Sequence, residues 1–147
     1  EKLYLAFLYA PPEEQTRQFV LANIRDGNPQ LVVIVADNVV GWCDVVRDSF
    51  HVKAHCGTLG IALLPGFRGK GIGRKLMHAA IQAAWAGGFR RINLTVRSNN
   101  TQAVALYKQL GFAQEGHHRQ AVQIDGNYFD LYSMALLHPS LVSTQMT

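Results

Sequence analysis

The segment from residue 58 to residue 97 places the strongest constraint on the fold, because a strand there passes through glycines directly into a helix. Residues 58–64 form an apolar run that a Pro-Gly pair ends. Apolar side chains then recur at helical spacing over residues 72–85, and a Gly-Gly pair follows. Residues 91–97 alternate apolar and polar side chains, as a half-buried strand does. This order of elements predicts a right-handed parallel crossover.

The flanking segments complete a mixed α/β pattern. Residues 13–26 are predicted to form a helix, since two prolines and two glutamates mark its start and a glycine follows its end. Hairpins are predicted for residues 31–46 and 112–137, each around a turn-forming dipeptide. Asn99 or Asn100 can cap a further helix. The predicted buried faces of the last two helices are Ile72, Leu76, Ala80, Ala83 and Ala84, and Ala103, Leu106, Tyr107 and Leu110.

Composition limits the class of protein. A chain of 147 residues with 48% hydrophobic and 16% charged residues predicts one globular domain, residues 1–147, with 138–147 as a tail. No apolar run reaches the ~18 residues of a membrane span, and we expect no basic-then-apolar leader with a small-residue cleavage site. Cys43 and Cys56 fit neither a disulfide framework nor a zinc site. We therefore expect a cytoplasmic protein without a metal and without a membrane segment.

The charged residues are distributed unevenly. No acidic side chain occurs between Ser49 and Gln114, whereas this stretch carries nine lysines and arginines; the net charge of the whole chain is +4. Such a stretch creates a positive field that gathers anions, although a solvated basic face or a nucleic-acid-binding module has the same composition. The nine residues are Lys53, Arg68, Lys70, Arg74, Lys75, Arg90, Arg91, Arg97 and Lys108.

The glycine-rich loop between the strand and the helix indicates which anion is bound. Glycines allow successive backbone N–H groups to approach a phosphate, and the start of a helix adds partial positive charge. The Walker phosphate loop is excluded because Lys70 is followed by Gly71 rather than by Ser or Thr. The dinucleotide-binding fingerprint is excluded because the glycines run 69, 71 and 73 and no acidic residue occurs between the loop and Glu115. A third pattern, R/Q-x-x-G-x-G/A, is matched by Arg68, Gly71 and Gly73.

With this pattern the sequence resembles the GNAT superfamily of acetyl-CoA-dependent N-acetyltransferases. Residues 100–107 match a second signature, N-x-x-A-x-x-L-Y, and Gly111 and Phe112 follow it. The resemblance covers residues 30–137 and implies a twisted, largely antiparallel sheet that splays at a central parallel strand pair and is flanked by helices. The first strand of the family precedes its helices, so we expect it to be absent here, unless the start lies elsewhere.

The resemblance also implies the cofactor contacts. Backbone groups of residues 62–64 would bind the pantetheine arm and the glycine loop the pyrophosphate, while Lys75 and Lys108 either reach the 3′-phosphate or stay solvated. Asn100 either bonds the pantetheine or only caps its helix. The implied contacts to coenzyme A are Ala62, Leu63, Leu64, Arg68, Gly69, Lys70, Gly71, Ile72, Gly73, Arg74, Asn100, Ala103 and Tyr107.

Catalysis requires an oxyanion donor, an acid and a base. The resemblance implies that the N–H of Leu63 or Leu64 is the oxyanion donor and that Tyr107 protonates the leaving thiolate, unless it is a core tyrosine. The positions at which family members carry a glutamate base are Gly57 and Thr95 here, and neither side chain can act as a base. His55, two residues before Gly57, is then the candidate.

Other bases and the acceptor pocket stay open. Asp44, Glu115, Asp130 or waters are alternatives to a histidine base. The candidates for the acceptor pocket are Tyr4, Phe7, Trp42, Tyr128 and Asp130, although ordinary core packing also explains the aromatic residues. Cys56 has no base beside it in sequence and is expected to fill the core.

The expected function is direct transfer of an acetyl group from acetyl-CoA to a primary amine of a small molecule, an amino acid or a peptide N-terminus. We expect neither nucleic acid nor membrane as a partner, and a homodimer is compatible with the sequence. A basic nucleic-acid-binding module and an acyl-CoA sensor without turnover are the alternatives. The lack of a carboxylate base in the expected positions is compatible with the acyl-CoA sensor. The lack of an aromatic platform counts against the nucleic-acid-binding module.

Overall fold

The computed structural model describes residues 11–142, which form a six-stranded sheet with its helices. Gly27 ends the first helix in the left-handed conformation, at φ 69°, as its place after residue 26 predicts. In chain order the elements are α1 (Glu13–Asp26), β1 (Gln30–Val35), β2 (Asn38–Arg47), the 3-10 turn η1 (His51–Lys53), β3 (Cys56–Leu63), the 3-10 turn η2 (Pro65–Phe67), α2 (Ile72–Ala86), β4 (Arg91–Arg97), α3 (Thr101–Gln109), β5 (Ala113–Ile124), β6 (Asn127–Leu137) and α4 (Pro139–Val142).

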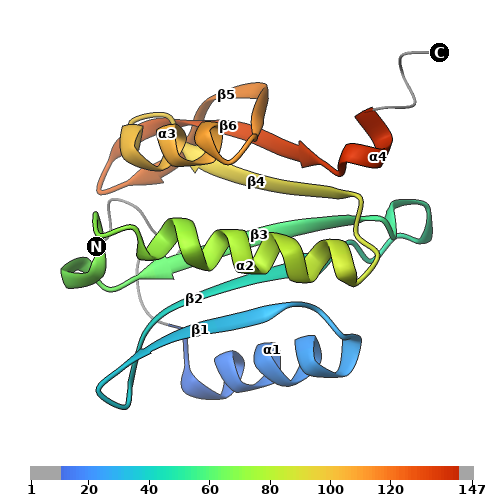
Figure 1. Cartoon of the computed structure of the whole chain (residues 1–147). Helices are drawn as coiled ribbons and strands as arrows, with labels where there is room; N and C mark the ends of the chain where they lie inside the picture. The colour runs from blue at the N-terminus through green and yellow to red at the C-terminus, as the bar shows by residue number, and fades with distance from the viewer. Residues whose placement is uncertain (1–10, 143–147) are drawn as a thin grey trace.

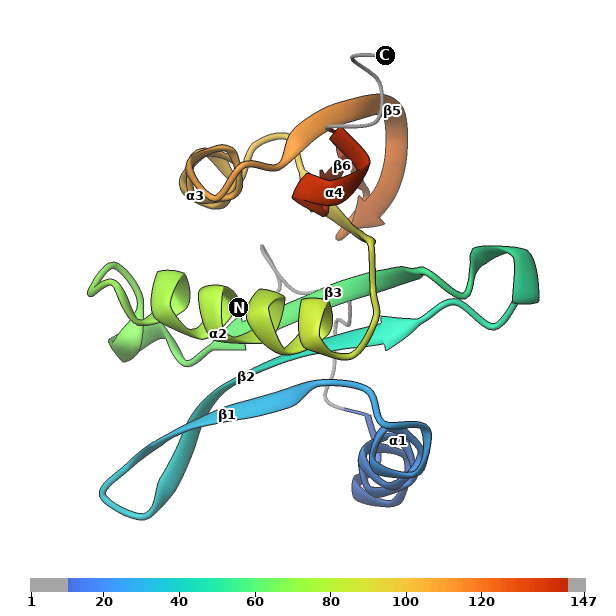
Figure 2. The same cartoon turned by 45° about the vertical axis from the view of Figure 1, so that its right-hand side comes forward.

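The sheet separates at its centre, as the resemblance implies. The strand order is β1-β2-β3-β4-β6-β5, and β3 and β4 are its parallel neighbours. Their pairing covers three residue pairs and stops at Thr58–Asn93, whereas β3 stays paired with β2 as far as Leu63. Beyond Thr58 the two strands diverge, and Figures 1 and 2 show the resulting gap between two half-sheets. The predicted splay is therefore confirmed.

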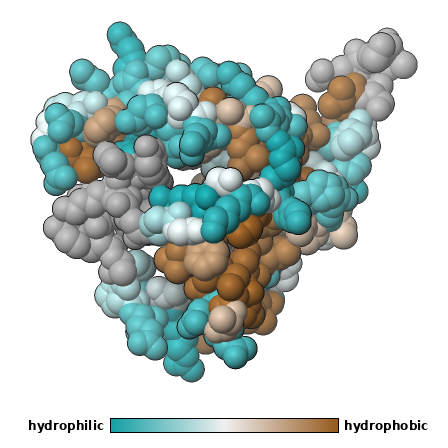
Figure 3. All heavy atoms as spheres, turned by 60° about the vertical axis from the view of Figure 1, so that its left-hand side comes forward, coloured by the Kyte–Doolittle hydropathy of each residue, from teal (hydrophilic) through white to brown (hydrophobic). Residues whose placement is uncertain are grey.

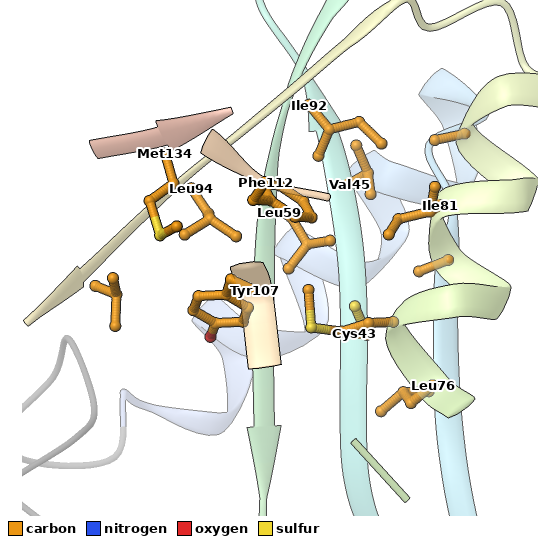
Figure 4. Close-up of a cluster of buried hydrophobic side chains, with 14 of the residues drawn as sticks. Cys43, Val45, Leu59, Leu76, Ile81, Ile92, Leu94, Tyr107, Phe112 and Met134 are labelled. Atoms are coloured by element: carbon orange, nitrogen blue, oxygen red, sulfur yellow. The ribbon is translucent and has the colours of Figure 1, made fainter. Parts of the chain in front are cut away.

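The core lies between α2, α3 and one face of the sheet (Figure 4). Phe89, Ile92 and Met134 are buried there beside the inner side chains of α2. The prediction for α2 is partly wrong, because Ala83 is exposed. The buried side chains of α2 are Leu76, Met77, Ala80, Ile81 and Ala84, a stripe with helical spacing that includes two residues the sequence pattern missed.

The two faces of the sheet have different roles. Because side chains alternate along a strand, Cys43, Val45 and Leu59 face the core with α2. Trp42 and Asp44 then point to the opposite face, where both lie next to Gly60 of β3. This opposite face therefore carries polar groups beside the gap.

The part of the chain that the structure describes contains neither a membrane-spanning helix nor a cluster of metal ligands. No helix within residues 11–142 combines the length and the apolar character needed to cross a membrane. The described histidines, cysteines and acidic residues also form no group of three that could hold a metal ion.

The core packing predicts a large effect of a single methyl group at Gly57. A Cβ atom built there would lie 2.5 Å from the Phe89 ring and 2.6 Å from Val45, and both of these side chains are fully buried. Gly57→Ala should lower the free energy of unfolding by about 1–3 kcal/mol, the usual effect of overpacking. Urea denaturation measures this change.

Gly66→Ala is the matched control. Nothing lies within 4 Å of a Cβ at Gly66, so this variant should unfold with nearly the stability of the wild type. Equal stability of all three proteins would contradict the tight packing around Gly57.

Candidate active site

The loop before α2 has the backbone geometry of an anion cradle. Gly69 and Gly71 take left-handed φ angles of 73° and 79°, which favour glycine. Nothing lies within 4 Å of the Cβ position of either residue, so open space faces the loop there. Gly71 is also the N-cap of α2 and supplies no capping side chain.

The backbone N–H groups of residues 69–74 point to no acceptor among residues 11–142. Within the described chain, none of them donates a hydrogen bond to a backbone or side-chain oxygen, and the first capping bond of α2 is that from Lys75 N–H to Gly71 O. Successive N–H groups at the positive end of a helix bind oxyanions. The loop can therefore accept a phosphate or a pyrophosphate.

Basic side chains surround this cradle. Arg68 Nε donates to Leu63 O at 2.9 Å and thereby ties the loop to the end of β3. Arg74 bonds to Gln109 Oε1 and joins α2 to α3. Arg74, Lys75, His78 and Leu110 line a hollow of about 390 Å³, which places positive charge next to the loop.

Backbone hydrogen bonding decides which amides of β3 face the gap. The N–H of Leu64 donates to Val40 O at 2.8 Å, so Leu64 has no free amide for an oxyanion. Because pairing alternates along antiparallel strands, Ala62 also bonds toward β2, whereas Leu63 faces the gap. Of the two expected oxyanion donors, the N–H of Leu64 is therefore not available, and the N–H of Leu63 remains the candidate.

The second signature positions α3 beside the gap. Asn100 caps this helix, since its Oδ1 accepts a hydrogen bond from Ala103 N–H at 3.3 Å. This contact confirms the capping role that the sequence left open. Ala103 packs against the buried cluster at the same end of α3.

Tyr107 of α3 is 9% exposed, and its ring lies 6.1 Å from that of Phe112. Figure 4 shows its hydroxyl pointing away from Phe112, and no residue in the described part of the chain hydrogen-bonds to it. Burial, with a smaller effect of Cys43, raises the pKa of Tyr107 to about 12. The phenol therefore keeps its proton at neutral pH and is a hydrogen-bond donor.

The candidate base from sequence is not placed at this site. His55 precedes β3, so its assignment to the strand was wrong, and its Nε2 lies 3.4 Å from Cys56 Sγ. His55 lies next to the end at which β3 and β4 are paired. Extended chain rises ~3.3 Å per residue, so His55 is about 26 Å from Leu63 along the strand. Gly57 faces the buried Phe89 ring, so its position has no room for a carboxylate.

Two of the alternative acidic residues are engaged elsewhere. Glu115 pairs with Arg91, whose hydrogen bond lowers the pKa of this carboxyl. Asp130 accepts a hydrogen bond from Gln120 N–H at 2.8 Å and lies 2.7 Å from His117 Nε2, and these contacts lower its pKa. Neither carboxylate is therefore suited to remove a proton from an amine.

The third alternative, Asp44, is buried at 6% exposure. Burial raises the pKa of its carboxyl to about 6. Cys43, on the core face, has a pKa raised to about 12 by burial and by Asp44, and it stays a neutral thiol. Sequence reasoning included Asp44 among several acids, but no sequence signal indicated its burial.

The candidate acceptor residues are only partly brought together. Trp42 is 43% exposed and lies beside Gly60, while Tyr128 is exposed at the start of β6. Asp130 lines a hollow of about 700 Å³ with His118, Arg119 and Gln120, a group that the sequence did not predict. Tyr4 and Phe7 lie outside the described residues.

Comparison with known proteins agrees with this geometry. Residues 2–112 match the model of the Acetyltransferase (GNAT) family. The chain is 31% identical to L-amino acid N-acetyltransferase AaaT of Escherichia coli (strain K12), over 91% of this chain and 83% of that protein. It is 36% identical to L-methionine sulfoximine/L-methionine sulfone acetyltransferase of Pseudomonas paraeruginosa (strain DSM 24068 / PA7), over 78% of this chain and 68% of that protein.

The fold is also shared with solved structures. The structure of yncA from Salmonella typhimurium, solved with its cofactor acetyl-CoA, superposes with a TM-score of 0.86 at 24% identity and covers 91% of this chain and 78% of that one. The chain belongs to the GNAT acetyltransferase family and is an N-acetyltransferase that transfers the acetyl group of acetyl-CoA to an amine.

Proposed function

We propose that the backbone N–H groups of residues 69–74 hold the pyrophosphate of acetyl-CoA. The observation that carries this proposal is the lack of a protein acceptor for any of these amides within the described chain. The left-handed Gly69 and Gly71 support it, because they keep side chains out of the space above the loop. Lys70 and Arg74 add positive charge, and Ile72 and Gly73 supply the first amides of α2.

The pantetheine arm would then run along the edge of β3 into the gap. Leu63 offers its N–H to the thioester oxygen, on which negative charge develops during attack. The Tyr107 hydroxyl donates to the sulfur that leaves, since its pKa of about 12 keeps it protonated. Asn100 still has its Nδ2 group for the arm, and Ala103 lies beside it.

The acceptor is proposed to be the α-amino group of a free L-amino acid. The two relatives described above support this class, because both are named for acetylation of amino acids or of methionine derivatives. Trp42 and Tyr128 would flank the side chain of the acceptor.

We also propose that the enzyme is a cytoplasmic homodimer. The two free and buried cysteines, Cys43 and Cys56, support a reducing compartment. Figure 3 shows hydrophobic surface gathered in the lower half of the molecule, the half that contains α1, β1 and β2 in Figure 1. Val32, Ile34 and Val39 are each more than half exposed there, which supports contact with a second copy.

A thiol-release assay with acetyl-CoA and a panel of acceptors tests the proposed class. Free L-amino acids should react with a higher kcat/KM than polyamines or peptides, because they present an α-amine and a carboxylate together. Amino acid amides, which lack the carboxylate, are the matched control and should react more slowly. Faster turnover of polyamines or peptides than of every free amino acid would contradict the proposal.

The loop can be tested with two glycines of the same conformation. Gly71 and Gly27 both have left-handed φ angles, of 79° and 69°, and open surroundings. Gly71→Trp should weaken acetyl-CoA binding about tenfold or more, a loss of ~1.4 kcal/mol, because the indole fills the cradle. Gly27→Trp has similar strain, about 1–2 kcal/mol, at the end of α1 and should bind normally.

Isothermal titration calorimetry measures the affinity of Gly71→Trp and of Gly27→Trp for acetyl-CoA. Equal affinity of Gly71→Trp and Gly27→Trp for acetyl-CoA would remove the loop from the binding site.

Replacing Tyr107 by phenylalanine tests the proton donor. Tyr107→Phe should lower kcat about 10²-fold, since general acid catalysis contributes at least that much, with unchanged acetyl-CoA affinity. The free energy of unfolding should stay the same or rise, because the buried hydroxyl has no bonding partner in the described chain. Steady-state kinetics and calorimetry separate these effects, and unchanged kcat would exclude Tyr107 from the reaction.

A further inference from the structure

Asp44 stands apart from the other acidic residues. Among the buried residues of the described chain, Asp44 is the only one with an acidic side chain, and it is 6% exposed. No described residue donates a hydrogen bond to its carboxylate, whereas Glu115 and Asp130 both have strong partners. A carboxylate in such surroundings is stabilised when water or a ligand donates a hydrogen bond to it.

The register of β2 and β3 places this carboxylate at the gap. Asp44 lies opposite Gly60, and its Oδ1 is 3.4 Å from the position that a Cβ on Gly60 would take. The ring of Trp42 lies 3.2 Å from the same position. Gly60 follows Thr58, where the pairing of β3 with β4 ends, by two residues. The missing side chain of Gly60 therefore lets the Trp42 ring and the Asp44 carboxylate lie directly over β3 at the closed end of the gap.

The proposed function brings the reacting groups to this point. An arm that starts from a pyrophosphate at residues 69–74 and follows β3 runs toward the place where β3 and β4 rejoin. The thioester would then lie between Leu63, which binds its oxygen, and Gly60. The Oδ1 atom of Asp44 lies over Gly60, and an arm along the far edge of β3 is one further strand spacing, about 4.8 Å, away.

We propose that Asp44 is the catalytic base, which binds the ammonium group of the acceptor and removes its proton. This inference rests on the proposed function. It assigns to β2 the carboxylate that Gly57 and Thr95 do not supply.

The proton and electron balance is complete with the groups named. The ammonium gives one proton to Asp44, and the neutral amine nitrogen forms a bond to the thioester carbonyl carbon. The carbon–sulfur bond breaks with its electron pair on sulfur. The nitrogen loses its second proton and the sulfur gains one through the Tyr107 hydroxyl, so that an amide and a thiol form. Asp44 finally releases its proton to solvent.

The surroundings of Asp44 favour an α-amine over an alkylamine. Its pKa of about 6 lies about 2 units below that of an α-amino group and more than 4 units below that of a lysine-like amine. β3 presents Thr58, Gly60 and Ala62 on this face and β1 presents Gln30, none of which titrates. Cys43 lies on the core face, and the charged groups of β4 on this face across the gap are Arg91 and Arg97.

Asp44→Asn tests this assignment, because it removes the charge and keeps the shape. With an L-amino acid acceptor, kcat/KM should fall about 10²- to 10⁴-fold, while acetyl-CoA affinity stays unchanged. The wild-type kcat/KM should decline below pH 6, where the carboxyl takes up a proton, and the variant should lack this acidic limb. With a hydrazide acceptor, which is unprotonated at neutral pH, the loss should be much smaller.

Asp37→Asn is the matched control. Asp37 is exposed in the β1–β2 turn with a φ of 62°, which asparagine also adopts, and this variant should keep the wild-type rate. Folding is checked by the melting temperature at pH 8, which should not fall in Asp44→Asn, since a buried charge has been removed.

The possible results are distinguishable. Wild-type turnover of amino acids together with an active Asp44→Asn that keeps the acidic limb would overturn the role of Asp44 and leave the proposed function standing. Lack of turnover with every amine in the wild type would overturn both. An equal loss of rate for amino acids and hydrazides would show a structural role and would also overturn the assignment.

Discussion

The short pairing between β3 and β4 is the constraint on which the site depends. Three residue pairs join two half-sheets that are otherwise antiparallel, and the strands then separate. The half-sheets keep their own ladders up to Leu63 and Arg97, so the inner edges of β3 and β4 carry backbone groups without a neighbouring strand. Buried backbone groups need partners, and the arm of an acyl carrier can supply them. The loop at the end of β3 then fixes the direction in which that arm enters.

Local sequence patterns predicted the parts of the fold that short-range chemistry determines. Glycines with left-handed φ angles at positions 27, 69 and 71 mark a helix end and a loop, because glycine takes these angles without steric cost. The alternation of residues 91–97 and the Asn100 cap are local signals of the same kind. The parallel pair also followed from the order strand, helix, strand. The short extent of the β3–β4 pairing did not follow from this order, because only the family resemblance implied it.

Contacts between strands account for what the sequence could not predict. The direction of the Leu64 amide depends on Val40 of the neighbouring strand. The burial of Asp44 depends on Trp42 beside it and on the bare backbone of Gly60 across the ladder. The exclusion of Gly57 as a base position depends on Phe89, which comes 32 residues later in the chain. His55 was assigned to a strand that begins one residue after it. Val40, Gly60 and Phe89, which decide the first three cases, are all distant in sequence from the residues that they affect.

The bond from Arg68 to the carbonyl of Leu63 has a mechanical consequence. It fastens the phosphate-binding turn to the last residue of the strand along which the acyl chain would lie. This bond therefore holds the turn at a fixed distance from the rim of the opening. A carrier that bound both would meet its two anchoring points already spaced.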